Sequence, residues 1–358
     1  MKKIKAFLKY KNIIISGKRY GVDALGAMAQ GLFCSLLIGT IIRTLGQQLG
    51  IGFLVDIGQY AFDMSGPAMA VAIGYALQAD PLVLFSLAGV GWAANAEGGA
   101  GGPLAVLIIA IVAAEFGKLV SKETKVDILV TPAVTVVVGV ALAKLIAPPI
   151  GSVAGAFGTV IDQATKLQPF WMGIAVSVLV GIALTLPISS AAICSVLGLT
   201  GLAGGAAVAG CCAQMVGFAF MSLRENGPGG LVSQGLGTSM LQMGNIVKNP
   251  RIWIPPILTS AITGPLATCL FCLQMNGEPV SSGMGTCGLV GLIGVWTGWL
   301  SPSEKALAKG ATATIPGLMD WAGLLLICFV LPAVLTWAFG LILRKIGWIK
   351  EGDLKLAD

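Results

Sequence analysis

Long apolar stretches separated by short polar segments follow one another from residue 22 to the C-terminal part of the chain. A stretch of about 20 apolar residues is long enough to cross the hydrocarbon core of a membrane as an α-helix. The apolar residues are continuous and do not alternate with polar ones, which argues against a membrane β-barrel. The pattern predicts an all-α polytopic integral membrane protein whose clearest spans cover residues 22–45, 51–77, 104–120, 126–146 and 318–343.

Two segments break this pattern. Residues 82–94 are apolar but too short to span comfortably, and the polar run NAEGGAGGP follows at 95–103. Such a piece is typical of a broken helix or a re-entrant hairpin. Pro148 and Pro149 are predicted to end the span that starts at residue 126, and residues 150–168 are predicted to form an amphipathic connector along the membrane surface.

Three sequence patterns occur twice in the same order. G-x-A-(x)5-G-x-A-L stands at 66–77 and 173–184, E-x-G-x-G-G at 97–102 and 225–230, and P-x-x-T ends at Thr135 and at Thr259. This order predicts an internal duplication, with repeat 1 at about 52–148, repeat 2 at about 169–276 and C-terminal helices at 281–346. The alternative is a chance match, because a chain with 50 glycines repeats short patterns easily.

The composition and the distribution of charge agree with a membrane protein. Only 11% of the residues are charged, whereas a soluble domain has roughly 25%. Basic residues gather at the two ends of the chain, so by the positive-inside rule both termini are expected to be cytoplasmic, in a multi-pass protein of the cell (inner or plasma) membrane. Residues 1–19 are expected to form a basic amphipathic segment on the lipid surface, residues 20–346 a single membrane transport domain, and residues 347–358 a cytoplasmic tail.

Several classes of function are excluded by what the sequence lacks. The chain has no histidine, no nucleophile with a neighbouring base, no metal-ligand cluster and no phosphate-binding G-x-x-x-x-G-K-[ST] loop. The basic ends are topology signals and lipid contacts, and nothing indicates binding to nucleic acid. We therefore predict no catalytic residue, no metal site and no cofactor.

The candidate site is the stretch 223–256, which places charged, amide and hydroxyl residues between membrane segments. Irregular polar backbone at membrane depth is tolerated only where protein or a watery cavity satisfies it. Carboxylate and amide groups suit hydroxyl-rich ligands because each makes several directional hydrogen bonds. With Ser239 and Gln242 as further polar groups, the predicted substrate-binding residues are Asn95, Glu97, Gly99, Arg224, Glu225, Asn226, Gln234, Thr238 and Asn245. The alternative is that Arg224 and Glu225 form an ion pair at the membrane interface, with the glycines as a turn.

A second polar feature lies within residues 51–63. Asp56, Gln59, Tyr60 and Asp63 share one face of a helix, because they are spaced by three, four and seven residues. Asp56 and Asp63 on this face would line a path for an ion or a proton. Alternatively, residues 51–62 form an interfacial segment whose acids face water.

The run RENGPGGLVSQGLGTSMLQMGNIVKNPRIWIPP, together with NAEGGAGGP, resembles the phosphotransferase-system EIIC type 2 membrane family, which includes perfringolysin-regulator-like (PfoR-like) proteins. The resemblance covers nearly the whole chain. It implies a sugar-permease fold like that of the EIIC glucose superfamily, with about ten spans, re-entrant hairpins and a homodimeric state. It also implies that Glu97 and Glu225 bind the sugar and that separate soluble IIA and IIB proteins carry out any phosphorylation.

These observations lead to a permease that binds and translocates a small polar solute, a sugar or a related metabolite, between its two acidic glycine-rich loops. One alternative is a PfoR-like membrane sensor that binds a metabolite and signals to a regulator without transport. Another is a proton- or ion-coupled carrier that uses Asp56 and Asp63.

Overall fold

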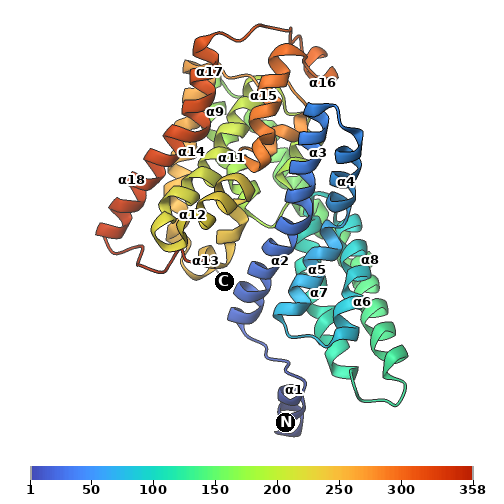
Figure 1. The fold of residues 1–358 in the computed structure, drawn as a ribbon. Helices are drawn as coiled ribbons and strands as arrows, with labels where there is room; N and C mark the ends of the chain where they lie inside the picture. The colour runs from blue at the N-terminus through green and yellow to red at the C-terminus, as the bar shows by residue number, and fades with distance from the viewer. Residues whose placement is uncertain (1, 357–358) are drawn as a thin grey trace. The chain divides into compact units, whose positions relative to one another are not determined.

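The computed structural model describes residues 2–356, and the side chains of residues 6–356. Almost all of this chain is helical (Figure 1). The α-helices are α1 (Lys2–Tyr10), α2 (Ala24–Leu32), α3 (Ile38–Leu49), α4 (Gly52–Asp63), α5 (Ser65–Ala76), α6 (Pro81–Gly98), α7 (Gly102–Val120), α8 (Asp127–Thr165), α9 (Pro169–Thr185), α10 (Ser190–Val196), α11 (Gly201–Met221), α12 (Leu223–Val232), α13 (Met243–Lys248), α14 (Ile254–Pro265), α15 (Val290–Leu300), α16 (Glu304–Leu307), α17 (Leu318–Leu325) and α18 (Leu331–Lys345). Short π-helical turns lie at Arg19–Asp23, Phe33–Leu37, Ser233–Gly237, Leu266–Leu270 and Leu326–Val330, and 3-10 turns at Gly99–Gly101, Ser239–Gln242, Pro250–Trp253, Pro279–Gly283 and Cys287–Leu289.

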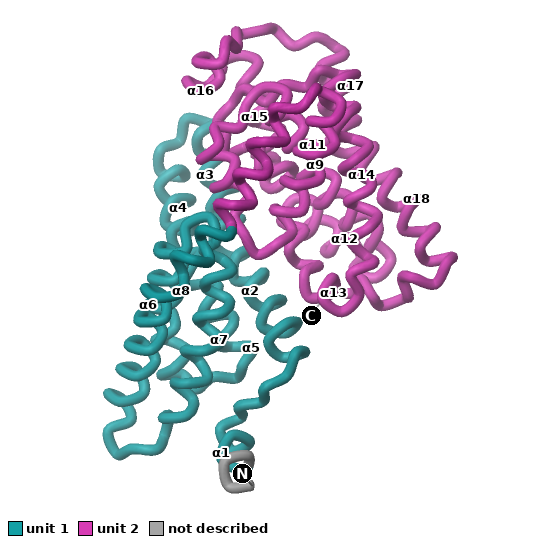
Figure 2. Tube along the Cα trace, turned by 180° about the vertical axis from the view of Figure 1, so that it is seen from behind, with its two compact units in different colours: residues 1–153 teal, residues 154–358 magenta. Residues whose placement is uncertain are grey.

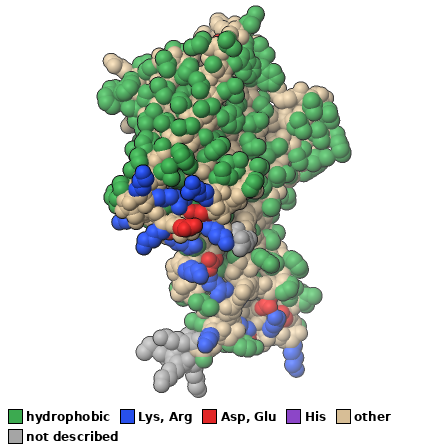
Figure 3. Space-filling model, turned by 60° about the vertical axis from the view of Figure 1, so that its left-hand side comes forward, with side chains coloured by type: hydrophobic (Ala, Val, Ile, Leu, Met, Phe, Trp, Pro, Cys, Tyr) green, Lys and Arg blue, Asp and Glu red, His purple; other side chains and the backbone are tan. Residues whose placement is uncertain are grey.

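Helices of membrane-spanning length dominate the fold. Among residues 2–356, six helical stretches are long and apolar enough to cross a membrane: Arg19–Leu49, Pro81–Val120, Asp127–Thr165, Gly201–Met221, Pro250–Leu270 and Leu318–Lys345. Pro169–Thr185 and Cys287–Leu300 are shorter apolar helices. Hydrophobic side chains cover most of the face drawn in Figure 3, and charged side chains gather in a restricted part of it. The prediction of an all-α polytopic membrane protein is confirmed.

The chain divides into two compact units, Met1–Val153 and Ala154–Asp358 (Figure 2). Helices α1 to α7 belong to the first unit and α9 to α18 to the second, whereas α8 begins in the first unit and ends in the second. Each unit contains one of the two acidic glycine-rich loops found in the sequence, 97–102 and 225–230.

Small residues allow the helices of the first unit to pack closely. A Cβ atom added to Gly66 of α5 would lie 2.4 Å from the carbonyl oxygen of Gly91 in α6, so the two backbones touch at this point. Val83, near the start of α6, lies against Gly117, near the end of α7. Helices α6 and α7 therefore run antiparallel and form a hairpin whose tip is the turn Gly99–Gly101.

Helix α11 forms the centre of the second unit. It is almost entirely buried and packs against α9, α14 and α18 (Figure 1). A Cβ atom on Gly210 of α11 would lie 1.9 Å from the carbonyl oxygen of Ser177, and one on Gly264 of α14 would lie 2.1 Å from that of Gly173. Any side chain at these two crossings would collide with backbone, so glycine sets how closely the three helices approach.

The prediction that Pro148 and Pro149 end a helix is wrong, because α8 continues through both prolines to Thr165. Residues 150–165, predicted to form a separate connector, are therefore a continuation of α8. A proline removes one hydrogen bond to the preceding turn. In apolar surroundings, leaving the helix altogether would leave many more backbone groups without partners, so the helix tolerates the prolines. The hydroxyl of Ser152 also donates to the carbonyl oxygen of Pro148, at 3.1 Å.

The predicted single span 51–77 is also wrong, because it consists of two helices, α4 and α5, on either side of Met64. Helix α4 packs along α3, where a Cβ atom on Gly39 would lie 2.6 Å from the carbonyl oxygen of Gly58. This backbone contact between two glycines holds α4 against α3. The apolar pattern of the segment contains no sign of it.

Candidate functional site

The second acidic loop, 225–230, lies within the short helix α12, which follows the buried helix α11. Helix α11 ends at Met221, α12 begins at Leu223, and Gly227 interrupts α12 with φ 60° and ψ −165°. Residues with a side chain rarely adopt this conformation, so glycine is required here. Pro228 follows, and proline suits the first turn of a helix because it has a fixed φ and no N–H group. The loop thereby presents Glu225 on a single turn between two helical segments.

Glu225 is a nearly buried carboxylate with two separate partners. Its Oε1 accepts a hydrogen bond from Nη2 of Arg344 in α18 at 2.7 Å, and its Oε2 accepts one from the backbone N–H of Leu354 at 2.8 Å. The side chain of Glu225 is 7% exposed. A buried carboxylate is tolerated when it is paired and hydrogen-bonded. The counter-charge of Glu225 is thus Arg344, and the pair with the neighbouring Arg224 that the sequence allowed is not the one formed.

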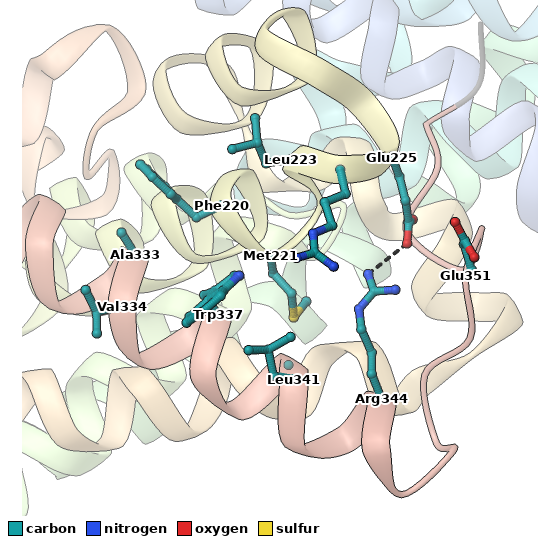
Figure 4. Close-up of a pocket in the computed structure, with 12 residues that line it drawn as sticks. Phe220, Met221, Leu223, Glu225, Ala333, Val334, Trp337, Leu341, Arg344 and Glu351 are labelled. Carbon is teal, nitrogen blue, oxygen red and sulfur yellow. Dashed lines mark hydrogen bonds and ion pairs between the residues drawn. The ribbon is translucent and has the colours of Figure 1, made fainter.

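A cavity of about 410 Å³ lies beside Glu225. Helices α11 and α18 supply an apolar wall that includes Phe220 and Trp337. Figure 4 shows the guanidinium group of Arg344 directed at the carboxylate of Glu225, and Glu351 on the chain that follows α18. The charged residues of the lining are Arg224, Glu225, Arg344 and Glu351. The site therefore combines an apolar aromatic surface with cationic and anionic groups.

Amide side chains continue from the loop towards α13 as a hydrogen-bonded chain. Gln234 Nε2 donates to Ser222 Oγ at 2.9 Å and to the carbonyl oxygen of Gly230 at 2.8 Å. Gln234 Oε1 accepts from Gln242 Nε2 at 2.8 Å, and Gln242 Oε1 accepts from Asn245 Nδ2 at 2.8 Å. Both glutamines are fully buried. The structure thus joins two of the predicted residues, Gln234 and Asn245, through Gln242.

Two of the predicted residues also contact the backbone near the C-terminal end of the chain. Asn226 Nδ2 donates to the carbonyl oxygen of Leu354 at 2.8 Å, and Asn226 Oδ1 accepts from the N–H of Leu356 at 2.8 Å. Asn245 Nδ2 donates to the carbonyl oxygen of Lys355 at 2.9 Å. The acidic loop and the amide chain therefore meet at the same short backbone segment.

The other two predicted residues of this stretch have different surroundings. Thr238 is buried, and its hydroxyl accepts from the N–H of Met240 at 3.1 Å, which caps the turn Ser239–Gln242. This contact is local and forms the turn. Arg224 is exposed and lines the cavity.

The first acidic loop is the tip of the hairpin between α6 and α7. Gly99 has φ 50° and ψ −122°, again a conformation that favours glycine. Glu97 forms an ion pair with Lys144 of α8. Asn95 Nδ2 lies 3.5 Å from Ser65 Oγ, at the limit of a hydrogen bond. Helix α6 includes both predicted residues that precede the turn, so it is longer than the apolar piece 82–94.

The polar residues of α4 lie on the outside of the first unit. Asp56 and Asp63 are exposed, and Gln59 Nε2 donates to Asp63 Oδ1 at 2.7 Å. The ion path proposed from their spacing stays a prediction.

A model of one protein family matches nearly the whole chain. This family is described as Phosphotransferase system, EIIC, and the match covers residues 22–356. The chain belongs to the EIIC family. Searches among curated proteins and among solved structures found no match. The resemblance seen in the sequence is thereby confirmed at the level of the family, and the regulator-like function stays a prediction.

Membership of the EIIC family supports a multi-pass membrane sugar permease in general. It also implies a sugar substrate and soluble IIA and IIB partners. The matched residues include both acidic loops, the amide chain and the C-terminal segment that contacts it.

A second buried polar cluster in this EIIC chain was not predicted from the sequence. Gln214 of α11 is fully buried, and its Oε1 accepts from Trp253 Nε1 at 2.9 Å and from Thr185 Oγ1 at 3.3 Å. The hydroxyls of Thr185 and Ser239 lie 2.8 Å apart. In the sequence, the signal for this cluster is a single amide residue, Gln214, within the apolar run of α11. Its partners come from distant segments, which no local pattern reveals.

A buried charged cluster in the first unit was missed as well. Lys118 Nζ lies 3.0 Å from Glu115 Oε2 and donates to the carbonyl oxygens of Asn12 and Leu77, at 2.8 and 3.1 Å. Tyr20 Oη donates to Glu115 Oε1 at 3.0 Å. The cluster joins the N-terminal segment to α7. Its signal in the sequence is a pair of opposite charges three residues apart within an apolar run.

Outside the spanning helices, Asp80 precedes α6 and contacts the loop after α7. Ser121 Oγ donates to Asp80 Oδ2 at 3.0 Å, and Lys122 forms an ion pair with Asp80. Burial acts most strongly on the pKa of Asp80 and raises it, but the hydrogen bonds from Lys122 and Ser121 and the charge of Lys122 outweigh burial, so the pKa is lowered. The pKa of Lys122 is raised, chiefly by its hydrogen bond to Asp80.

Proposed function

We propose that this EIIC chain binds and translocates a sugar or a related small polar metabolite, and that the acidic loop around Glu225 forms part of the binding site. The observation that carries the proposal is the cavity of about 410 Å³ beside Glu225. Small-molecule sites commonly have volumes of roughly 300–1,000 Å³, apolar walls and a few convergent polar groups. This cavity has all three features.

The lining suits a hydroxyl-rich ligand. A sugar hydroxyl can donate to a carboxylate oxygen of Glu225 and accept from the guanidinium group of Arg344, because a hydroxyl is both donor and acceptor. Trp337 supplies an apolar aromatic surface on the same cavity. A sugar ring also presents an apolar C–H face, which can pack on such a surface.

The two acidic loops share their construction, which supports the proposed internal duplication. In each loop, a glycine with positive φ stands two residues after the glutamate: Gly99 with φ 50° and Gly227 with φ 60°. In each loop, the carboxylate pairs with a basic side chain from a later helix. The helix before each loop also has a matching neighbour, since α5 packs on α6 and α9 packs on α11. We therefore assign Glu97 the same role in the first unit as Glu225 has in the second.

Sugar binding at this site requires the loop to move. A hydroxyl that takes a place between Glu225 and Arg344 must separate the two groups. Hinges are short segments that absorb changes in φ and ψ, and Gly227 interrupts α12 at such a position. The proposed movement therefore changes α12 and leaves the buried helix α11 intact.

Further parts of the proposal concern the assembly. We place both termini on the cytoplasmic side, where soluble IIA and IIB proteins would phosphorylate the transported sugar. We also propose a homodimer in which residues 20–346 of each copy form one membrane domain. A PfoR-like sensor is the competing function, and it would bind the same solute without moving it across the membrane.

The proposal is tested by uptake into liposomes that contain the purified full-length protein. The liposomes are loaded with unlabelled sugar, and exchange is measured for a panel of radiolabelled hexoses, hexosamines, pentoses and hexitols. We expect saturable exchange of at least one panel member and a loss of about tenfold or more in the Glu225→Gln variant, since the carboxylate contributes a charged hydrogen bond. The control variant is Asp162→Asn, which removes only an exposed surface pair with Lys166.

Three outcomes of this experiment have different meanings. Exchange by Glu225→Gln at the wild-type rate would remove Glu225 from the mechanism. Binding of a sugar by the wild-type protein without exchange would favour the sensor. A Glu225→Gln protein with a lower thermal midpoint than Asp162→Asn would show that the substitution destabilises the fold, and in that case the comparison is made with Glu225→Asp, which keeps the charge and shifts only its position.

A further inference from the structure

The C-terminal tail, residues 347–356, folds back onto the acidic loop of its own unit. Gly347, two residues after the end of α18, has φ 79°, and its N–H donates to the carbonyl oxygen of Arg344 at 3.0 Å. Gly352 has φ 91° and makes a second turn. Both conformations favour glycine. The two turns direct the tail back towards α12 and α13 rather than away from the protein.

The first half of the tail is anchored beside α13. Asn249 Nδ2 donates to the carbonyl oxygen of Trp348 at 3.0 Å and to Asp353 Oδ2 at 2.8 Å. Asp353 Oδ2 also accepts from the N–H of Lys350 at 2.8 Å. The guanidinium carbon of Arg251 lies 5.3 Å from the centroid of the Trp348 ring, within the range of a cation–π contact. The first half of the tail is therefore held in place by Asn249 and Arg251. We call this bound position of the tail its seating.

The second half presents Leu354 to the candidate site. The N–H of Leu354 donates to Glu225 Oε2 at 2.8 Å. Its carbonyl oxygen accepts from Asn226 Nδ2 at 2.8 Å and from Gln242 Nε2 at 2.9 Å. The side chain of Leu354 is 0% exposed. One residue of the tail thus satisfies a carboxylate and two amides at the same time.

The next two tail residues continue this contact through their backbone. The carbonyl oxygen of Lys355 accepts from Asn245 Nδ2 at 2.9 Å, and the N–H of Leu356 donates to Asn226 Oδ1 at 2.8 Å. The side chain of Lys355 is exposed and takes no part. The tail offers both donors and acceptors to carboxylate and amide groups, and a polyhydroxylated ligand would also offer both.

We propose that tail residues 350–356 are a built-in competitor of the transported sugar. The inference rests on the proposed function, because it assumes that Glu225 and its neighbouring amides bind the sugar. While the N–H of Leu354 occupies Glu225 Oε2, that oxygen cannot accept a sugar hydroxyl in the same geometry. Glu351 of the tail also lines the cavity. Sugar binding and tail seating therefore exclude each other.

Competition of this kind lowers the apparent affinity for sugar. A ligand binds more weakly in proportion to the fraction of protein that is binding-competent. If the tail is released in about one molecule in ten, complete release strengthens binding about tenfold. The tail thereby sets how much sugar the permease needs before it is occupied.

The test uses the full-length protein in lipid nanodiscs with two tail variants. Leu354→Asp places a second carboxylate beside Glu225, and Leu356→Pro removes the N–H that donates to Asn226. Lys355→Ser is the matched control, because it changes an exposed side chain and keeps all backbone contacts. Hydrogen exchange of the 350–356 amides reports tail seating. Equilibrium binding of the same sugar panel reports the site.

We expect the amides of Leu354 and Leu356 to exchange slowly in the wild type and in Lys355→Ser. In Leu354→Asp, exchange of the tail amides should accelerate, and both release variants should bind the sugar about tenfold more tightly than the wild type. Two results would overturn the proposal: wild-type tail amides that exchange as fast as those of a free peptide, or release variants with a mobile tail and an unchanged sugar affinity.

The failure of the proposed function has a different signature. Suppose that neither the wild type nor any variant binds a member of the panel, while the wild-type tail amides are protected from exchange. That result would refute both the permease function at this site and the competition between tail and sugar. The tail would then be a structural cap of the amide chain. Should Leu354→Asp fail to fold, Leu356→Pro decides, since Leu356 is only half-buried and its side chain is not part of the core.

Discussion

The sharpest test of the loop geometry is the substitution Gly227→Ala. Gly227 has φ 60° and ψ −165°, and a Cβ atom added there would meet nothing within 4 Å. The substitution therefore introduces no collision, and its whole cost comes from the backbone conformation. A non-glycine residue forced into such a region costs about 1–3 kcal/mol.

Gly229→Ala is the matched control in the same helix. A Cβ atom at Gly229 also meets nothing within 4 Å, but Gly229 does not have a positive φ. Both substitutions reduce the conformational entropy of the unfolded chain by the same amount, about 0.4–1 kcal/mol. This contribution cancels when the two variants are compared. Gly227→Ala should therefore be less stable than Gly229→Ala by the backbone strain alone, about 1–3 kcal/mol.

The free energies of unfolding are measured by denaturant titration in mixed micelles, with tryptophan fluorescence as the probe. Gly99→Ala is the corresponding variant of the first loop, because Gly99 has φ 50° and equally open surroundings. Stabilities of Gly227→Ala and Gly229→Ala that agree within about 0.5 kcal/mol would refute the reasoning, since a surface substitution without strain changes stability by no more than that.

Two further predictions concern the first unit. Lys118→Met removes the cation that pairs with Glu115, and the side chains of Lys118 and Glu115 are only 3% and 12% exposed, respectively. Because the carboxylate of Glu115 is then left largely buried without a counter-charge, the free energy of unfolding should fall by about 3–5 kcal/mol. Adding Glu115→Gln should recover part of the loss in the same titration, and no recovery would contradict the pairing. Because the pKa of Asp80 is lowered in the folded protein, its ionised form stabilises the fold above the usual carboxyl pKa, and this contribution disappears as the pH falls through the lowered value. The stability difference between wild type and Asp80→Asn should therefore be constant near neutral pH and shrink below about pH 4; a constant difference down to about pH 3 would contradict this.

Much of the fold could be predicted because the signal is local. A run of about 20 apolar residues determines a spanning helix by its own length and composition. The interruption of α4 and α5 at Met64 and the passage of α8 through Pro148 and Pro149 could not be predicted in this way. The contact between Gly39 and Gly58 holds α4 against α3, and the cost of leaving a helix in apolar surroundings keeps α8 helical through its prolines; neither is a local signal.

The candidate site shows the same division. The pattern E-x-G indicated an acid followed by a turn, and Gly227 does adopt the conformation that only glycine takes readily. The counter-charge of Glu225 was not predictable, because Arg344 lies 119 residues further along the chain. The contact with Leu354 was equally hidden, since it involves a backbone N–H, which every residue except proline has. Local patterns thus identified the acid, and long-range packing supplied its partners.

The hydrogen-bond partners of the two carboxylate oxygens of Glu225 narrow the class of ligand that can replace the tail. Within the described part of the chain, Oε1 is held by Arg344 and Oε2 by the N–H of Leu354, so a ligand that displaces the tail must bring a new donor to Oε2. The same ligand must bring acceptors for Asn226 and Asn245, which now donate to tail carbonyl groups. A lone cation would satisfy the carboxylate but repel the amide donors, and an anion would do the reverse. A ligand with several hydroxyls meets both requirements, because each hydroxyl donates one hydrogen bond and accepts others. On the proposed function, the tail therefore marks the site as one for a neutral polyol and argues against an inorganic ion.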